Sequence, residues 1–183
     1  MRGRARHPVR WLVTTLLAFG VGCGTPPDEG GETRFDVLEQ SITELAAALD
    51  TGAVTSRELV ASYLERIEAY DQRGPGLNAV VIINPDVLAV ADARDAERAA
   101  GRVRGPLHGI PVVVKDNYDT ADMPTSGGAI GLATSVPPDD AFQVRRLREA
   151  GAIILAKTNM HELAYGIETV SSLGGQTRNP YDP

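Results

Sequence analysis

Cysteine and lysine are the scarcest reactive residues in this sequence. Cys23 is the single cysteine among 183 residues, and it precedes the predicted globular part, so an internal disulfide and a buried thiol nucleophile are both excluded. Lys115 and Lys157 are the only lysines, against sixteen arginines. Arginine therefore supplies the ordinary positive charge, whereas a lysine can lose its proton when it is buried. A GC-rich genome would also deplete lysine, so functional and compositional explanations of Lys115 both stay open here.

Histidines and common catalytic motifs are also few. His108 in a turn and His161 near a helix start are interpreted as structural or surface residues, and they supply too few ligands for a metal site. There is no Gly-x-Ser-x-Gly nucleophile elbow. Lys115 is followed by Asp116 rather than by the Ser or Thr of a phosphate loop, and the glycine-rich segment 127–131 follows no predicted strand. We therefore expect no metal and no cofactor.

The first 22 residues have the pattern of an export signal. Four arginines precede an apolar run at 11–21 that is too short to span a bilayer. The pattern is similar to a bacterial lipoprotein signal, in which Cys23 becomes the lipidated N-terminus, although Gly20 stands where leucine is usual. A simple secretory signal cut near Gly22 is the alternative. We expect a signal peptide at 1–22, a flexible linker at 23–36 and an exported protein, lipid-anchored on the periplasmic or outer face.

Removal of the signal makes the chain strongly acidic. It leaves 14 basic and 24 acidic residues, a formal charge of −10. Such a surface repels phosphate backbones, so a nucleic-acid partner is not expected. The oligomeric state stays open.

Apolar periodicity and turn residues predict an α/β fold in residues 37–183. Capping boxes at Ser41–Glu44 and Thr55–Glu58 predict two helices. Two strand–helix–strand passages follow and predict parallel neighbouring strands. The expected strands are 77–83, 112–114 and 152–156, and the expected helices are 84–100, capped by Asn84 before Pro85, and 139–150, capped by Asp139 and Asp140. We expect loops at 119–138 and 171–183, and a helical turn or two at 160–165.

Lys115 directly follows the buried-strand pattern of Val112–Val114, where apolar packing gives way to a loop. We expect its side chain to be buried and desolvated. A lysine in water has a pKa of about 10.4, and burial can lower it by up to roughly 3–5 units, enough to make a base near neutral pH. Adjacent strand residues point to opposite faces, so Asp116 should point away from this amine.

Four segments together resemble the amidase signature hydrolases over roughly residues 40–183. They are Gly-Pro-Leu-His-Gly-Ile-Pro-Val-Val-Val-Lys-Asp-Asn at 105–117, Leu-Arg-Glu-Ala-Gly-Ala at 147–152, Lys-Thr-Asn-Met-His-Glu-Leu-Ala at 157–164 and Gly-Gly-Gln-Thr-Arg-Asn-Pro-Tyr-Asp-Pro at 174–183. The resemblance implies a mixed sheet flanked by helices. It also implies a small-molecule amide substrate cleaved through an acyl-enzyme by a Ser–cis-Ser–Lys triad.

The resemblance assigns roles to some residues of this sequence, but two members of the implied triad have no counterpart in it. Lys115 matches the catalytic lysine, and Lys157 matches a lysine outside the triad, which we interpret as structural. Residues 164–166 (Ala164, Tyr165 and Gly166) match part of the substrate pocket, although Gly166 would equally suit the end of a helix. Both triad serines follow the Asn-Pro-Tyr-Asp-Pro segment in this family, and Ser171 and Ser172 match neither. We therefore expect an N-terminal fragment with a fold incomplete at its C-terminus and no activity alone.

Two other functions stay open. One is that of a tRNA-dependent amidotransferase component, which works on charged tRNA and against which the export signal and the acidic surface both count. The other is a non-catalytic envelope lipoprotein that keeps the amidase scaffold as a binding module.

Overall fold

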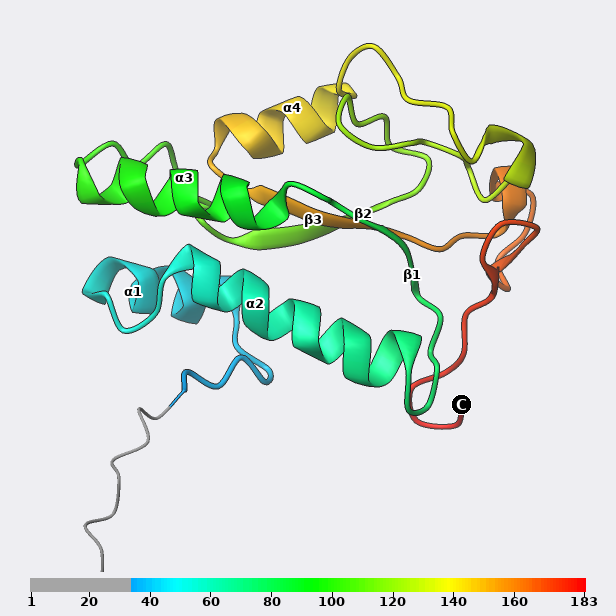
Figure 1. The fold of residues 1–183 in the computed structure, drawn as a ribbon, viewed down its shortest axis with the longest axis horizontal. Coiled ribbons are helices and arrows are strands. Elements are labelled where there is room, and N and C mark those ends of the chain that lie inside the picture. The colour runs from blue at the N-terminus through cyan, green and yellow to red at the C-terminus, as the bar shows by residue number, and fades with distance from the viewer. Residues whose placement is uncertain (1–33) are drawn as a thin grey trace, which may run out of the picture. The chain divides into compact units, whose positions relative to one another are not determined.

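The computed structural model describes residues 34–183, so the predicted signal peptide, Cys23 and most of the predicted linker lie outside the described residues. Figure 1 shows the helices arranged around a central sheet. The helices are α1 (Ile42–Thr51), α2 (Ser56–Arg66), α3 (Val87–Ala99) and α4 (Phe142–Glu149), and the sheet strands are β1 (Val80–Ile83), β2 (Pro111–Lys115) and β3 (Ile153–Thr158). Shorter elements are a π-helical turn (Ile67–Gln72), 3-10 turns (Ile130–Leu132 and Glu162–Ala164) and the pair β4 (Val170–Ser171) and β5 (Gly175–Gln176).

Within residues 34–183, none of the helices combines the length and apolar character that a bilayer crossing requires.

The two predicted capping boxes are confirmed. The Ser41 hydroxyl accepts a hydrogen bond from the Glu44 backbone N–H, and the Glu44 carboxylate accepts one from the Ser41 backbone N–H. Thr55 and Glu58 make the same reciprocal pair at the start of α2. Each box satisfies N–H groups that have no partner inside their helix, which is why local sequence sufficed to locate these two starts.

The predicted cap of α3, Asn84, lies two residues before the observed cap, Asp86. α3 begins at Val87 after Asp86, because Asn84 is buried and its side chain bonds elsewhere. The Asn84 amide donates to the carbonyl of Ile154 at 3.0 Å, and its oxygen accepts from the Asp86 N–H at 2.9 Å. Asn84 therefore ties the end of β1 to β3 instead of capping the helix.

The predicted acidic cap of α4 is also wrong. The residue at the cap position is Ala141, which makes no capping hydrogen bond with its side chain. The Asp140 carboxylate instead accepts from the Ala121 N–H at 2.9 Å and pairs with Arg148 Nε at 3.0 Å. Asp140 is thus used to hold the loop before α4.

The sheet has the order β1-β3-β2 and is mixed. The prediction of parallel neighbours is confirmed for β2 and β3 and wrong for β1, which runs antiparallel to β3. β3 lies between β1 and β2, so the two strands joined by α3 do not pair. β1 is shorter than the predicted strand 77–83, because Asn78 has a left-handed φ of 56°, which an extended strand cannot contain.

β3 contains one extra residue relative to β2. Val112 pairs with Ile154, whereas the next residue, Val113, pairs with Ala156. Such a bulge breaks the two-residue alternation of side chains. Ile154 and Lys157, three positions apart, therefore face the same side of the sheet.

Helices cover both faces of the sheet (Figure 1). α2 and α3 pack on one face through a cluster of Val60, Val87, Ala91, Ile153, Leu155 and Ala156. α4 and the loop before it cover the other face through Val114, Met123, Val144 and Ile154. α1 packs on α2 beside Ile110, which precedes β2. The predicted α/β class is confirmed.

Candidate functional site

Lys115 is the last residue of β2, and its side chain is exposed. The expectation that it is buried is therefore wrong for the described part of the chain. β2 is an edge strand, and its final residues alternate, with Val114 and Asp116 buried and Val113 45% exposed. Lys115 lies on the same side of the sheet as Val113, where α2 and α3 leave the end of β2 exposed.

An open apolar groove of about 640 Å³ runs along this face. It lies between the sheet and the end of α2 with its π-helical turn, and its apolar wall includes Tyr63, Ile67, Tyr70, Leu77, Val113 and Leu155. Thr158, the cross-strand partner of Lys115, also lines the groove. Lys115 therefore stands beside an apolar surface that would desolvate its amine if a further layer of protein covered it.

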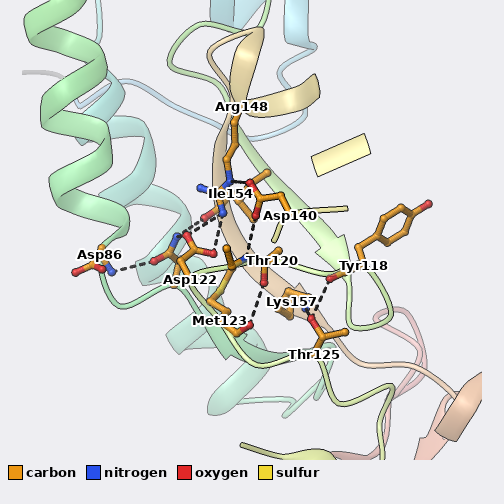
Figure 2. Close-up of polar contacts among 12 residues, drawn as sticks. Asp86, Tyr118, Thr120, Asp122, Met123, Thr125, Asp140, Arg148, Ile154 and Lys157 are labelled. Atoms are coloured by element: carbon orange, nitrogen blue, oxygen red, sulfur yellow. Dashed lines mark hydrogen bonds and ion pairs between the residues drawn. The ribbon is translucent and has the colours of Figure 1, made fainter. Parts of the chain in front are cut away.

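Lys157 is the buried lysine, with 0% of its side chain exposed. Its ammonium has three N–H groups and three acceptors: the Pro124 carbonyl at 3.1 Å, Thr125 Oγ1 at 2.9 Å and Asp116 Oδ1 at 3.4 Å. Figure 2 shows Lys157 directed at Thr125. Burial lowers the pKa of Lys157, and the charge of Asp116 acts in the opposite direction. These contacts suit the structural role predicted for Lys157.

Asp116 points away from Lys115, as predicted, and is completely buried. Besides Lys157, its carboxylate accepts hydrogen bonds from the hydroxyl of Ser126, from the Ser126 N–H at 3.4 Å and from the Gly128 N–H at 3.3 Å. Its backbone N–H donates to the Thr158 carbonyl at 3.1 Å. The residue next to Lys115 is thus held through both its side chain and its main chain.

Residues 164–166, the predicted substrate contacts, lie in and after a 3-10 turn. Ala164 and Tyr165 are exposed, and Gly166 packs so tightly on His161 that a Cβ there would lie 2.6 Å from the imidazole Cε1. Ala164 and the preceding Leu163 have φ values of 57° and 51°. Two successive left-handed residues other than glycine are strained, and such strain is frequent at functional sites.

Lys115 and residues 164–166 are connected only indirectly in the structure. Within residues 34–183, no hydrogen bond links Lys115 to 164–166. The connection runs through the turn at 124–128: the Gly127 N–H donates to the Asp116 carbonyl at 3.0 Å, and the Gly127 carbonyl accepts from the Leu163 N–H at 2.7 Å. The sequence predicted a loop at 119–138, which contains this turn, but not the hydrogen bonds of the turn to Asp116 and Leu163.

A second charged contact holds the same loop. Arg148 of α4 donates to both oxygens of Asp122 at 2.8 Å, and its Nε pairs with the carboxylate of Asp140 (Figure 2). His108 is buried, accepts from the Arg104 N–H at 3.2 Å and contacts the Arg94 carbonyl, which agrees with its interpretation as structural.

Amine acylation should separate the two lysines, because only their side chains and the N-terminus carry amines. At pH 8.5 Lys115 should react at least about tenfold faster than Lys157, which must wait for local or global opening. Mass spectrometry of peptides from the acylated chain at successive times measures both rates. Equal rates in the folded chain would contradict the burial of Lys157, and equal rates in urea serve as the control.

Known proteins of similar sequence and fold are amidases. The family model described as Amidase matches residues 58–183. The native peptide amidase from Stenotrophomonas maltophilia is 48% identical, with a TM-score of 0.75, over 79% of this chain and 30% of that chain. An amidase family protein from Bacillus anthracis is 41% identical, with a TM-score of 0.74, over 80% of this chain and 30% of that one.

A tRNA-dependent relative matches over the same region. The A-type component of the glutamyl-tRNA(Gln) amidotransferase from Azoarcus sp. is 46% identical over 147 residues, which are 80% of this chain and 29% of the relative. The chain thus spans somewhat less than a third of the length of these relatives. Since the family model covers more than half of the chain and the fold agrees, the chain belongs to the amidase signature family of hydrolases.

Proposed function

We propose that this chain contributes the lysine of an amide-hydrolysing site, with Lys115 as the base of a Ser–cis-Ser–Lys triad. The observation that carries the proposal is the placement of Lys115, which ends β2 with an exposed side chain, inside the segment that resembles the family's lysine motif. Lys157 has its three N–H groups engaged in the core and cannot serve.

The chemistry sets requirements that residues 34–183 do not meet by themselves. Lys115 must be neutral to accept a proton through a bridging serine from the nucleophilic serine, and it must later return that proton to the leaving amine. The exposed amine needs a covering layer of protein, which would extend the apolar wall of the groove over it. The two serines implied by the resemblance must also come from protein outside these residues. We expect the 183-residue chain to be inactive alone.

The substrate class follows from the same reasoning. A small carboxamide would be attacked by the nucleophilic serine, whose proton passes through the bridging serine to Lys115. Residues 164–166 are the nearest candidates for substrate contact on this chain. Export through residues 1–22 and lipidation at Cys23 would place this hydrolysis at the periplasmic or outer face of a membrane. The sequence likeness to the tRNA-dependent amidotransferase favours a second candidate function, that of an amidotransferase component. The export signal counts against it, as does the charge of −10 that remains after removal of residues 1–22. The third is a non-catalytic binding module on a lipid anchor.

A chimaera tests the proposal. Residues 34–183 would replace the matching 30% of the Stenotrophomonas maltophilia peptide amidase, so that the rest of that enzyme can supply the covering layer and the two serines that the proposal requires. We expect the chimaera to hydrolyse carboxamides, measured as ammonia release, whereas the 183-residue chain alone gives none. A chimaera that folds and melts cooperatively but releases no ammonia would favour the binding module.

A further inference from the structure

Lys115 and the strained segment at 163–164 are held by a common support, the turn at 124–128. Gly127 bonds to both sides, donating to Asp116 at 3.0 Å and accepting from Leu163 at 2.7 Å. The neighbouring Gly128 carbonyl accepts from the Leu173 N–H at 3.1 Å. A displacement of this turn would therefore move the end of β2 and the turn that precedes Tyr165 together.

The turn is itself fixed from inside the protein by one buried ion pair. Asp116 and Lys157 both have fully buried side chains and lie 3.4 Å apart. Lys157 holds the first half of the turn through Pro124 and Thr125. Asp116 holds the second half through the Ser126 hydroxyl and the N–H groups of Ser126 and Gly128.

We propose that Asp116 and Lys157 are positioning residues, which fix the turn at 124–128 and thereby set Lys115 and residues 163–166 relative to each other. This inference rests on the proposed function of those two segments. Both oxygens of Asp116 accept hydrogen bonds from the turn or from Lys157, so an asparagine, with one oxygen and one NH₂ group, cannot replace it. The pair is thus needed for its pattern of acceptors as well as for its charge balance.

Hydrogen exchange on the full chain tests the inference directly. The Leu163 amide reports the contact with Gly127, and the Tyr118 amide, which donates to the Lys115 carbonyl at 2.9 Å, reports the end of β2. The Ile153 amide, bonded to the Ile110 carbonyl at 2.9 Å, reports opening of the core. In Asp116→Asn, exchange at Leu163 and Tyr118 should rise about tenfold or more above the change at Ile153.

The matched control is Asp122→Asn, because Asp122 is a carboxylate of the same loop but bonds to Arg148 and Asn84 instead of the turn. In Asp122→Asn, the change in exchange rate at Leu163 and Tyr118 should stay within about twofold of the change at Ile153.

The double variant Asp116→Asn/Lys157→Met separates positioning from stability. Removing both charges leaves no unpaired buried ion, so the melting temperature should return toward that of the parent chain. Leu163 should still exchange fast, because the asparagine cannot restore the acceptors of the turn. Protection of Leu163 that recovers together with the melting temperature, or that never changes in Asp116→Asn, would overturn the inference. Failure of the proposed function would appear in ammonia release by the chimaera and not in these exchange rates.

Discussion

Replacing Lys115 with alanine in the peptide amidase chimaera should lower kcat/KM for carboxamide hydrolysis by about 10³-fold, within the roughly 10²–10⁴-fold range of general acid–base catalysis. The amine would be lost from the point where the proton relay ends, and a cooperative melting transition shows that the variant chimaera still folds. Initial rates at several substrate concentrations give the ratio.

Lys115→Arg provides the matched control for this measurement. A guanidinium keeps the positive charge and much of the length but stays protonated in proteins, so it cannot accept the proton. We expect it to be about as inactive as the alanine variant, in a chimaera that still melts cooperatively. Hydrolysis by Lys115→Ala within tenfold of the parent chimaera would remove Lys115 from the catalytic machinery.

Asp116→Asn should destabilise the chain by about 3–5 kcal/mol at pH 7, the cost of leaving a buried charge without its partner. Lys157 is 0% exposed and lies 3.4 Å from the Asp116 carboxylate, so water cannot solvate its ammonium once the carboxylate is lost. Urea unfolding followed by circular dichroism gives the free energy of unfolding for both chains.

The loss of unfolding free energy in Asp116→Asn should be smaller at alkaline pH than at pH 7. Burial lowers the pKa of Lys157 below 10.5 in the folded chain, and removal of Asp116, whose charge raises it, lowers it further. The folded variant then releases its proton at a pH where the unfolded chain still holds one, so stability rises with pH between the lowered pKa and 10.5. Unfolding of Asp116→Asn at pH 7 and pH 10 measures this gain. It should be absent from Asp116→Asn/Lys157→Met, and a gain that persists in that variant would assign the effect to another group.

Local chemistry was enough to predict much of the fold. The capping boxes at Ser41 and Thr55 placed two helix starts because each bonds only to residues of its own first turn. Asn84 and Asp140 looked equally good as caps but are engaged by distant partners, Ile154 and Arg148, which no short window of sequence contains. The antiparallel partner of β1 was missed for the same reason, since strand order depends on the whole sheet.

The candidate site was predictable in its residues but not in its surroundings. The lysine motif located Lys115, and alternation along β2 correctly separated it from Asp116. Burial of Lys115 was inferred from its valine neighbours, and that step failed because β2 is an edge strand whose last residues are left partly uncovered by α2 and α3. The partner of Asp116 could not be inferred, because a bulge in a strand far along the chain decides which way Lys157 points.

That bulge decides which side of the sheet carries the second ammonium group. If β3 kept its six residues but alternated strictly after Ile154, Lys157 would turn toward the side of Lys115, so that two ammonium groups would approach each other while Asp116 lost its counterion. The irregular backbone at Leu155, and not the side chain there, therefore keeps the two lysines on opposite sides of the sheet.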